Sequence, residues 1–159
     1  ELIESNIHLL EHKAILKGII INCKGTKERP NSLYYLNSEA FSAAFFNILE
    51  NAIKYSFNNS EITIKLIRKK NDGTSFLMIE NHGIGILQTE RSSIFEFETR
   101  GSNTTNEISG LGRGLWIANN LLTRQQLNGA SVKIEISKLK NPTKFKIIIP
   151  KNFLVLINE

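Results

Sequence analysis

The sequence is poor in cysteine and has no long hydrophobic run. Its 159 residues include a single cysteine, Cys23, which excludes an internal disulfide, gives no metal-ligand spacing and fits a reducing cytosolic setting. We expect Cys23 to be a small buried thiol. No apolar stretch approaches the roughly 20 residues of a membrane-spanning helix, and residues 1–6 lack the basic start of a signal peptide. The sequence therefore predicts a soluble chain without direct membrane contact.

What the sequence does contain is typical of a globular protein. Hydrophobic residues make up 41% of the chain and charged residues 22%, unlike the composition of disordered proteins. This length suits one domain, 1–159, with a sizeable core. The net charge of +5 suits a nucleotide, a nucleic acid or an acidic protein surface. The densest basic run, 68–70, adjoins Asn-Asp-Gly, which favours a hairpin turn over a nucleic-acid patch.

Hydrophobic periodicity predicts helices, a short strand and two β-hairpins. The predicted helices cover 2–16, 38–56 and 110–127, the strand covers 19–22, and the hairpins cover 62–79 and 132–149. Either Asn37 or Ser38 suits the cap of the second helix. Strands with one buried face and three amphipathic helices predict an α/β sandwich of two layers.

The second predicted helix carries a polar row opposite its apolar stripe. Asn47, Glu50, Asn51 and Lys54 follow one another at positions i, i+3, i+4 and i+7. A solvated helix face explains Glu50 and Lys54 taken alone. Two asparagines one turn apart indicate more, because asparagine is a weak helix former. Their amide oxygens are neutral hard ligands that suit Mg²⁺.

Two glycine-containing segments flank a polar loop. In 81–86, a polar side chain at a strand end can meet a base edge, while the glycines let the backbone approach a flat ring. In 110–115, three glycines open a helix whose unpaired amides attract phosphate. The spacing matches neither the Rossmann motif nor the P-loop. Residues 99–109 between them are almost without apolar side chains, so we expect a mobile loop.

In this order, the segments resemble the histidine-kinase branch of the ATPases that share the Bergerat fold with gyrase, the mismatch-repair ATPases and the large heat-shock chaperones. Residues 47–56 are similar to the N box, 81–86 to the first glycine box, 94–97 with Arg100-Gly101 to the phenylalanine box, and 110–115 to the second glycine box. The resemblance covers nearly the whole chain. It implies a mixed, mostly antiparallel sheet covered on one face by about three helices.

The resemblance implies the ATP-binding catalytic domain of a sensor histidine kinase, which donates the γ-phosphate of Mg-ATP to a histidine on a separate dimerisation and phosphotransfer domain. It implies that Asn51 coordinates Mg²⁺ with support from Asn47, that Lys54 touches phosphate or ribose, and that residues 98–110 form an ATP lid. The other implied nucleotide contacts are Tyr55, Asn81, Gly83, Gly85, Ile86, Arg100, Gly101, Gly110, Leu111, Gly112, Arg113, Gly114 and Leu115. A response regulator is an implied partner, nucleic acid is not, and the implied location is cytoplasmic even for a membrane-anchored parent protein.

The residue four positions before Asn51 separates the branches of this superfamily, because the anti-sigma-factor serine kinases usually have a glutamate there, as the hydrolysing relatives do. Hydrolysing relatives usually have a glutamate there, which acts as a general base, whereas this chain has Asn47. Because an amide has no useful basicity, ATP hydrolysis is disfavoured. Transfer to a nucleophilic imidazole needs mainly positioning and charge neutralisation. Glu50 is the nearby candidate base, and many histidine kinases carry an acidic residue at the matching place, so Asn47 and Glu50 are the catalytic candidates.

Two residues depart from the family pattern. Asn81 replaces an aspartate that normally accepts a hydrogen bond from the adenine amino group. A neutral bond of roughly 0.5–1.5 kcal/mol then replaces a charge-assisted one of roughly 1.5–3 kcal/mol, which lowers affinity by about tenfold. Glu80 is no substitute, because adjacent strand residues point to opposite faces. Arg113 stands where leucine is common, and either pairs with phosphate or lies on the surface.

Several further residues have structural or undecided roles. Neither His8 nor His12 lies in a motif close to His-Glu-x-x-x-Pro, so we expect neither to be phosphorylated. We expect Trp116 in the core, while Phe95 and Phe97 either steady the lid hinge or fill the core.

Two other functions and the C-terminal tail remain open. Asn81 also suits a catalytically weak nucleotide sensor or interaction module, and a hydrolytic ATPase is disfavoured by Asn47. The tail, 151–159, is apolar at 153–157 and forms either an extra strand or a contact surface.

Overall fold

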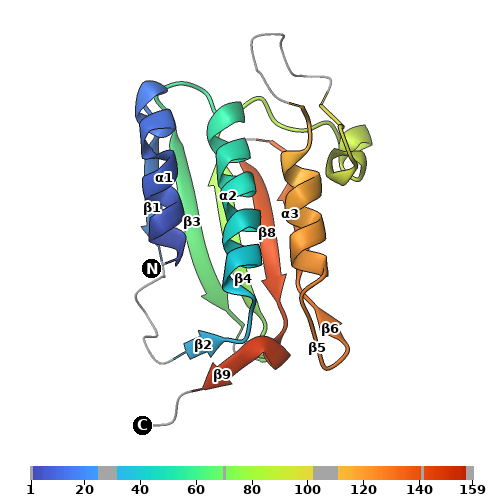
Figure 1. Ribbon diagram of the computed structural model, residues 1–159. Helices are drawn as coiled ribbons and strands as arrows, with labels where there is room; N and C mark the ends of the chain where they lie inside the picture. The colour runs from blue at the N-terminus through green and yellow to red at the C-terminus, as the bar shows by residue number, and fades with distance from the viewer. Residues whose placement is uncertain (1, 25–31, 70, 102–110, 141, 157–159) are drawn as a thin grey trace.

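The computed structural model has three helices on one face of a five-stranded sheet (Figure 1). It describes residues 2–24, 32–69, 71–101, 111–140 and 142–156. The sheet consists, in spatial order, of β1 (Ile20–Lys24), β3 (Glu61–Arg68), β4 (Ser75–Asn81), β8 (Thr143–Ile149) and β7 (Lys133–Lys138). The β1–β3 pair is parallel and the other neighbours are antiparallel. The predicted two-layer sandwich with a mixed, mostly antiparallel sheet is therefore confirmed.

The helices are α1 (Leu2–Leu16), α2 (Ser38–Tyr55) and α3 (Gly114–Thr123), and α2 lies between the other two (Figure 1). Asn37 is the N-cap of α2, because its side chain accepts a hydrogen bond of 2.8 Å from the Ala40 amide. The apolar stripe of α2 includes Phe45 and Ile48, which are fully buried against the sheet. Burial of each such side chain contributes about 1.5–3 kcal/mol. This stripe turns the polar row of α2 away from the sheet.

The third helix is shorter than its sequence pattern predicts. Gly112 has a φ of 69°, which a right-handed helix does not allow, so α3 begins at Gly114 rather than at residue 110. At the other end, Asn128 and Gly129 have φ values of 49° and 75°, as a two-residue hairpin turn requires. This turn joins β5 (Gln126–Leu127) to β6 (Ala130–Ser131), so residues 126–127 form a strand instead of helix.

The prediction of a buried Cys23 is wrong. Cys23 is exposed, because β1 is an edge strand of the sheet. Partial desolvation raises the pKa of its thiol, and the charge of Glu4 on α1 raises it further. The thiol therefore favours its neutral form.

A small second sheet lies at the end of the molecule where α2 begins (Figure 1). Here β2 (Ser32–Tyr34) pairs antiparallel with β9 (Leu154–Leu156), so residues 154–156 of the C-terminal tail form an extra strand. The described residues also form three short 3₁₀ helices: η1 (Gln88–Glu90), η2 (Ser93–Phe95) and η3 (Lys151–Phe153). Among the described residues, no helix has the length and apolar character needed to cross a membrane.

Candidate functional site

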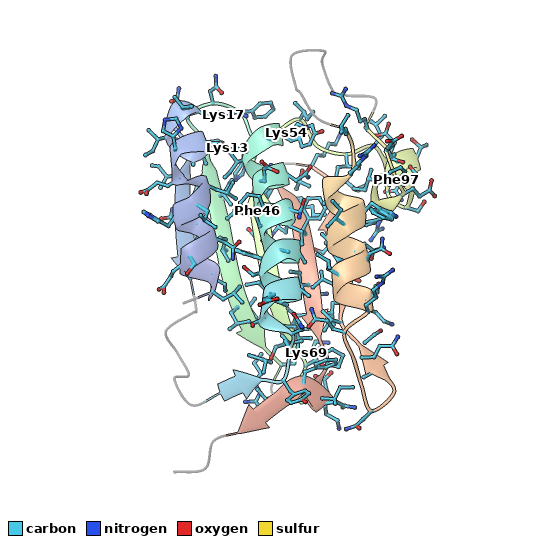
Figure 2. The ribbon with its side chains drawn as sticks, in the orientation of Figure 1. Lys13, Lys17, Phe46, Lys54, Lys69 and Phe97 are labelled. Carbon is cyan, nitrogen blue, oxygen red and sulfur yellow. The ribbon has the colours of Figure 1, made fainter. Side chains whose placement is uncertain are left out.

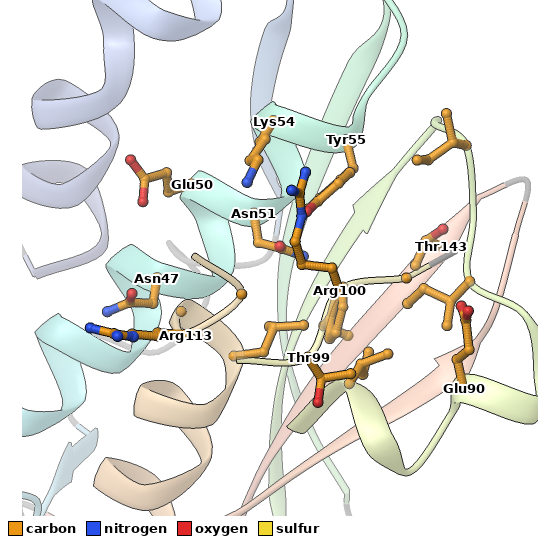
Figure 3. Close-up of a pocket in the computed structure, with 18 of the residues that line it drawn as sticks. Asn47, Glu50, Asn51, Lys54, Tyr55, Glu90, Thr99, Arg100, Arg113 and Thr143 are labelled. Carbon is orange, nitrogen blue, oxygen red and sulfur yellow. The ribbon is translucent and has the colours of Figure 1, made fainter. Parts of the chain in front are cut away.

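A cavity of about 330 Å³ opens where α2 ends and α3 begins (Figure 3). This volume lies within the range of small-molecule sites. The lining contains the two catalytic candidates, Asn47 and Glu50. Among the other predicted site residues it contains Asn51, Lys54, Tyr55, Asn81, Gly85, Ile86, Arg100, Gly101, Leu111, Gly112, Arg113, Gly114 and Leu115. Segments far apart in the sequence therefore meet at one place, as the order of motifs predicts.

Two predicted contacts are not in this lining. Gly110 belongs to 102–110, the central part of the predicted lid, which lies outside the described residues. Gly83 packs under the last turn of α2, where a Cβ atom would lie 2.0 Å from the Tyr55 carbonyl oxygen. The backbone of Gly83 thus approaches α2 rather than the cavity.

The inner end of the cavity, formed by Asn81, Ser56 and Thr143, is a chain of buried polar groups. Asn81 is only 3% exposed, and its amide nitrogen donates to the Ser56 hydroxyl oxygen at 3.2 Å. The Ser56 hydroxyl in turn donates to the Ala52 carbonyl at 2.7 Å. Because the amide nitrogen of Asn81 is engaged, its oxygen is the acceptor that remains for a ligand.

Thr143 lies beside Asn81, since β4 and β8 pair in the register Asn81 to Thr143, and its hydroxyl donates to the Leu139 carbonyl at 3.1 Å. Thr143 was not predicted from the sequence, because no local pattern reveals which strand neighbours β4. The lining residues Glu90, Ile117 and Phe145 were likewise not predicted, whereas Ile84, Ile94 and Thr99 lie within the predicted motifs and lid without having been singled out.

Glu80 points to the opposite face of β4, as predicted. Its carboxylate accepts from Lys144 at 3.0 Å and from Lys65 at 3.4 Å. Burial raises the pKa of Glu80, but its hydrogen bonds and charge interactions with the two lysines outweigh burial and lower the pKa overall. Glu80 is therefore an ionised residue of the open sheet face and contributes nothing to the cavity.

The polar row of α2 divides between the cavity and α1. The Asn47 amide nitrogen donates to the Ala43 carbonyl at 2.8 Å. Its oxygen lies close to α3, because a Cβ atom at Gly114 would be 3.2 Å from it. The Glu50 carboxylate pairs with Lys13 of α1, and Figure 3 shows it turned toward α1. The Glu50 carboxylate is therefore engaged in an ion pair with Lys13 and does not face the centre of the cavity.

Cationic side chains gather at the outer half of the cavity. The Lys54 ammonium lies 5.0 Å from the centre of the Tyr55 ring. Figure 3 shows Arg100 reaching from the segment after η2 toward Lys54 and Tyr55. The α3 helix begins beside them, and its N-cap residue, Arg113, makes no side-chain capping hydrogen bond. Unpaired amides at a helix start and nearby cations favour an anionic ligand.

Two glycines have conformations that other residues adopt only with strain. Gly85 has a φ of 76°, and a Cβ atom there would lie 2.6 Å from the Lys140 Cβ. Gly112 has a φ of 69°, and its Cβ would lie 2.5 Å from the Thr99 carbonyl oxygen. Gly112 therefore allows the chain at residues 111–113 to pack against the backbone of residues 98–99.

Beside the cavity, Phe97, Glu98 and Trp116 join the lining residue Arg113 in a cluster, called the rim below, that connects these two chain segments. Arg113 forms an ion pair with Glu98, with Nε 3.1 Å from Oε1, and its guanidinium lies 5.0 Å from the Phe97 ring centre. The Phe97 and Trp116 rings meet edge to face, with centroids 5.0 Å apart. Glu98 itself has a φ of 58°, which is uncommon outside glycine.

The positions of Phe95 and Phe97 decide between their two predicted roles, and the position of Trp116 contradicts its prediction. Phe97 is 52% exposed and does not fill the core, whereas Phe95 packs against the core. Trp116 is half-buried and contacts Phe97, so the prediction that it belongs to the core is wrong. It sits at the start of α3, on the side that faces Phe97 rather than the sheet.

Comparisons with known proteins identify the family and the fold. Residues 37–152 match the family described as histidine kinase-, DNA gyrase B-, and HSP90-like ATPase. The signal transduction histidine-protein kinase ArlS of Staphylococcus aureus (strain USA300) is 38% identical over 109 residues, which are 68% of this chain and 23% of ArlS. The chain thus spans less than a quarter of the length of that curated relative.

Solved structures share the fold at low sequence identity. A mycobacterial sensor histidine kinase, MprB, superposes with a TM-score of 0.72 at 20% identity, covering 94% of this chain and 92% of that one. The catalytic domain of the histidine kinase ThkA superposes with a TM-score of 0.73 at 22% identity, covering 95% and 91%. The complex of ThkA with the response regulator protein TrrA gives a TM-score of 0.68 at 20% identity, covering 95% and 40%.

Proposed function

This chain belongs to the family of histidine kinase-, DNA gyrase B-, and HSP90-like ATPases, and on that premise we propose that it is the ATP-binding catalytic domain of a sensor histidine kinase. It holds Mg-ATP in the cavity between α2 and α3 and donates the γ-phosphate to a histidine on a separate dimerisation and phosphotransfer domain of its parent protein. The observation that carries this proposal is the convergence of the four predicted motifs on one cavity.

The inner end of the cavity suits an adenine ring. The Asn81 oxygen accepts a hydrogen bond from the exocyclic amino group, while the donation from Asn81 to Ser56 holds the amide in that orientation. Ile94 and Phe145 supply apolar surface for the faces of the ring, and Tyr55 flanks the nucleotide. A buried acceptor with an apolar surround favours a neutral base over a charged ligand.

The outer half of the cavity suits the phosphates. Lys54 and Arg100 line it, and the glycines at the start of α3 let phosphate oxygens approach the helix amides. Arg113 has two roles open to it: it leaves Glu98 for a phosphate, or it stays at the rim. Arg113 is paired with Glu98, so it can contact a phosphate only after that ion pair breaks.

The donor set on α2 fits magnesium. Asn51, supported by Asn47, offers amide oxygens, and no group of three or more histidine, cysteine, aspartate or glutamate side chains suited to a metal ion occurs in the described part of the chain. An ion held here would take its other ligands from water and phosphate, as Mg²⁺ commonly does. When bound, it would neutralise phosphate charge during transfer.

Phosphotransfer is favoured over hydrolysis by the residues beside the phosphates. Asn47 cannot act as a base, and Glu50 must leave Lys13 before it can accept a proton. Catalysis therefore rests mainly on positioning the γ-phosphate for a histidine that is already nucleophilic. By analogy with ThkA, whose complex with a response regulator is known, the parent protein would act on a response regulator.

The second candidate function is a nucleotide-sensing or interaction module with little catalytic activity. Asn81 favours this candidate, because a neutral acceptor binds the adenine amino group more weakly than a carboxylate. Titration with a fluorescent ATP analogue, with and without Mg²⁺, separates the interaction module from the two nucleotide-binding candidates, and phosphate transfer separates the kinase from the nucleotide sensor. Absence of binding in both conditions would favour the interaction module.

The proposed kinase function is tested by labelled phosphate transfer. The wild-type chain, mixed with the purified acceptor domain of its parent protein and γ-labelled Mg-ATP, should label the acceptor histidine. An Asn51→Ala variant should transfer no detectable label, whereas Asn152→Ala, an exposed asparagine in η3 at the opposite end of the molecule, should transfer label like the wild type. Equal labelling by the Asn51→Ala variant would refute the proposed metal and phosphate site.

A further inference from the structure

The C-terminal end of α2 is capped by a lysine that does not belong to it. The last carbonyl groups of a helix have no hydrogen-bond donors within the helix, and α2 ends at Tyr55. Lys17 follows α1, and Figure 2 shows it at the same end of the molecule as Lys54. Its ammonium donates to the carbonyl oxygens of Ile53 at 3.0 Å, Lys54 at 2.9 Å and Ser56 at 2.6 Å.

These three hydrogen bonds use the full donor capacity of the ammonium group. A cation at this position also complements the partial negative charge at the C-terminus of a helix. Lys17 is half-buried, and burial lowers the pKa of its ammonium. A solvated surface lysine would show neither the three main-chain partners nor this desolvation.

The backbone of Lys17 is itself held in place. Its carbonyl accepts from the Asn59 amide at 2.8 Å. The next residue, Gly18, has a φ of 64°, and a Cβ atom there would lie 2.2 Å from the Asn59 side-chain oxygen. Leu10 and Ala14 are buried and anchor α1 in the core. The ammonium therefore extends toward α2 from a fixed support.

The end of α2 is joined directly to the inner end of the cavity. The Tyr55 carbonyl, which Lys17 does not contact, accepts from the Ile84 amide at 3.2 Å. Ser56 forms a β-bridge with Gly83, and its hydroxyl accepts from the Asn81 amide. A displacement of the last turn of α2 would thus change the orientation of Asn81.

We propose that Lys17 is a positioning residue for adenine recognition: by holding the last carbonyls of α2, it keeps Ser56 where the hydroxyl orients the Asn81 amide toward the base. This inference rests on the proposed nucleotide function. Lys17 touches no part of the nucleotide and acts only through α2. The proposal gives the end of α1 and the residue after it a part in base selection, although neither Lys17 nor any residue of α1 lines the cavity.

The test compares ATP with GTP, because GTP has a carbonyl oxygen at C6, where ATP has the amino group that the Asn81 oxygen would accept from. Lys17→Met should weaken ATP binding by about tenfold and GTP binding by no more than about twofold, so that discrimination between the bases falls. Lys17→Arg keeps the charge and several donors, and should recover most of the discrimination. Lys133→Met, at an exposed lysine on the edge strand β7, makes the same change of charge and should match the wild type.

The outcomes are separable by calorimetric titration of each variant, with circular dichroism as a check of folding. If the wild-type chain binds ATP and Lys17→Met keeps the wild-type ATP-to-GTP ratio, Lys17 has no positioning role. Equal weakening of both nucleotides would show a general structural role and would also overturn the inference. If the wild-type chain binds neither nucleotide, the proposed function itself fails.

A pH profile of the wild type and Lys17→Arg tests the inference even if Lys17→Met does not fold. Because burial lowers the pKa of Lys17 from its ordinary 10.5, wild-type ATP affinity should fall as pH rises through that lowered pKa. The Lys17→Arg variant keeps its charge and should lose less affinity over the same range, while both chains share every other titrating group. Identical profiles would contradict the role of Lys17.

Discussion

At the inner end of the cavity, Asn81 is buried and hydrogen-bonded to Ser56, whereas at the rim Arg113 and Glu98 form an ion pair whose side chains are 44% and 50% exposed. A buried polar group that loses its partner costs about 1–3 kcal/mol. An exposed ion pair contributes about 0–1 kcal/mol and is screened by salt. The inner end is therefore suited to hold one geometry, and the rim to exchange partners.

Replacing Asn81 by leucine should produce the largest effect on binding. Asn81→Leu removes the proposed acceptor for the adenine amino group and the donor to Ser56 at once. We expect ATP affinity to fall by about 100-fold, measured by calorimetric titration. The matched change Asn152→Leu, at the other end of the molecule, should leave affinity unaltered. ATP affinity retained in the Asn81→Leu chain would place the base elsewhere.

Asn81→Asp should have the next largest effect, in the opposite direction. A carboxylate accepts from the adenine amino group in a charge-assisted bond, which is stronger than a neutral one. The Ser56 hydroxyl must turn from the Ala52 carbonyl to donate to the other carboxylate oxygen. We expect ATP to bind about tenfold more tightly in the same titration. Unchanged affinity would show that the amide of Asn81 does not face the base.

A substitution of Glu80, on the opposite face of β4 from Asn81, should have an effect of intermediate size, on stability and not on binding. Glu80→Gln removes the charge that Lys65 and Lys144 surround, so the variant should lose about 1–2 kcal/mol of unfolding free energy at neutral pH. ATP affinity should not change, because Glu80 lies on the open face of the sheet. Chemical denaturation and nucleotide titration measure the two properties separately.

The difference in unfolding free energy between the wild type and Glu80→Gln should depend on pH in one direction. The pKa of Glu80 is lowered in the folded chain, so its contribution is complete above the unfolded-state pKa and declines as pH falls through the folded-state pKa. The stability gap between wild type and Glu80→Gln should therefore close in acid. A gap that widens in acid would contradict the assignment of an ionised Glu80.

Breaking the ion pair between Glu98 and Arg113 at the rim should have the smallest effect on ATP affinity. Glu98→Gln removes the carboxylate that holds Arg113, and we expect ATP to bind about two- to threefold more tightly at low salt, with AMP unaffected. Arg113→Gln in the same background should abolish the gain. If ATP affinity is the same in wild type and Glu98→Gln at low salt, Arg113 is a surface residue of the rim and not a phosphate ligand.

Much of the candidate site was predictable, because its residues come in short segments with their own physical signals. Two asparagines one turn apart, a polar side chain at a strand end and a glycine-rich helix start each have a chemical reason visible in a few neighbouring residues. The Asn128-Gly129 turn was equally visible and ends α3 early. The apolar residues over 110–127 have helical spacing up to this turn, so the spacing alone predicts a helix that is too long.

The sequence by itself determined the helices, the alternating strands and the residues that meet at the cavity, because periodicity and turn chemistry act over a few residues. Only the tertiary structure decided that Thr143 stands beside Asn81, that Cys23 lies on an exposed edge, that Glu50 pairs with Lys13, and that Lys17 caps α2. These contacts join residues distant in the chain, and their geometry follows from strand order and helix packing. No local pattern encodes that order, so the support of the site became visible only in the folded chain.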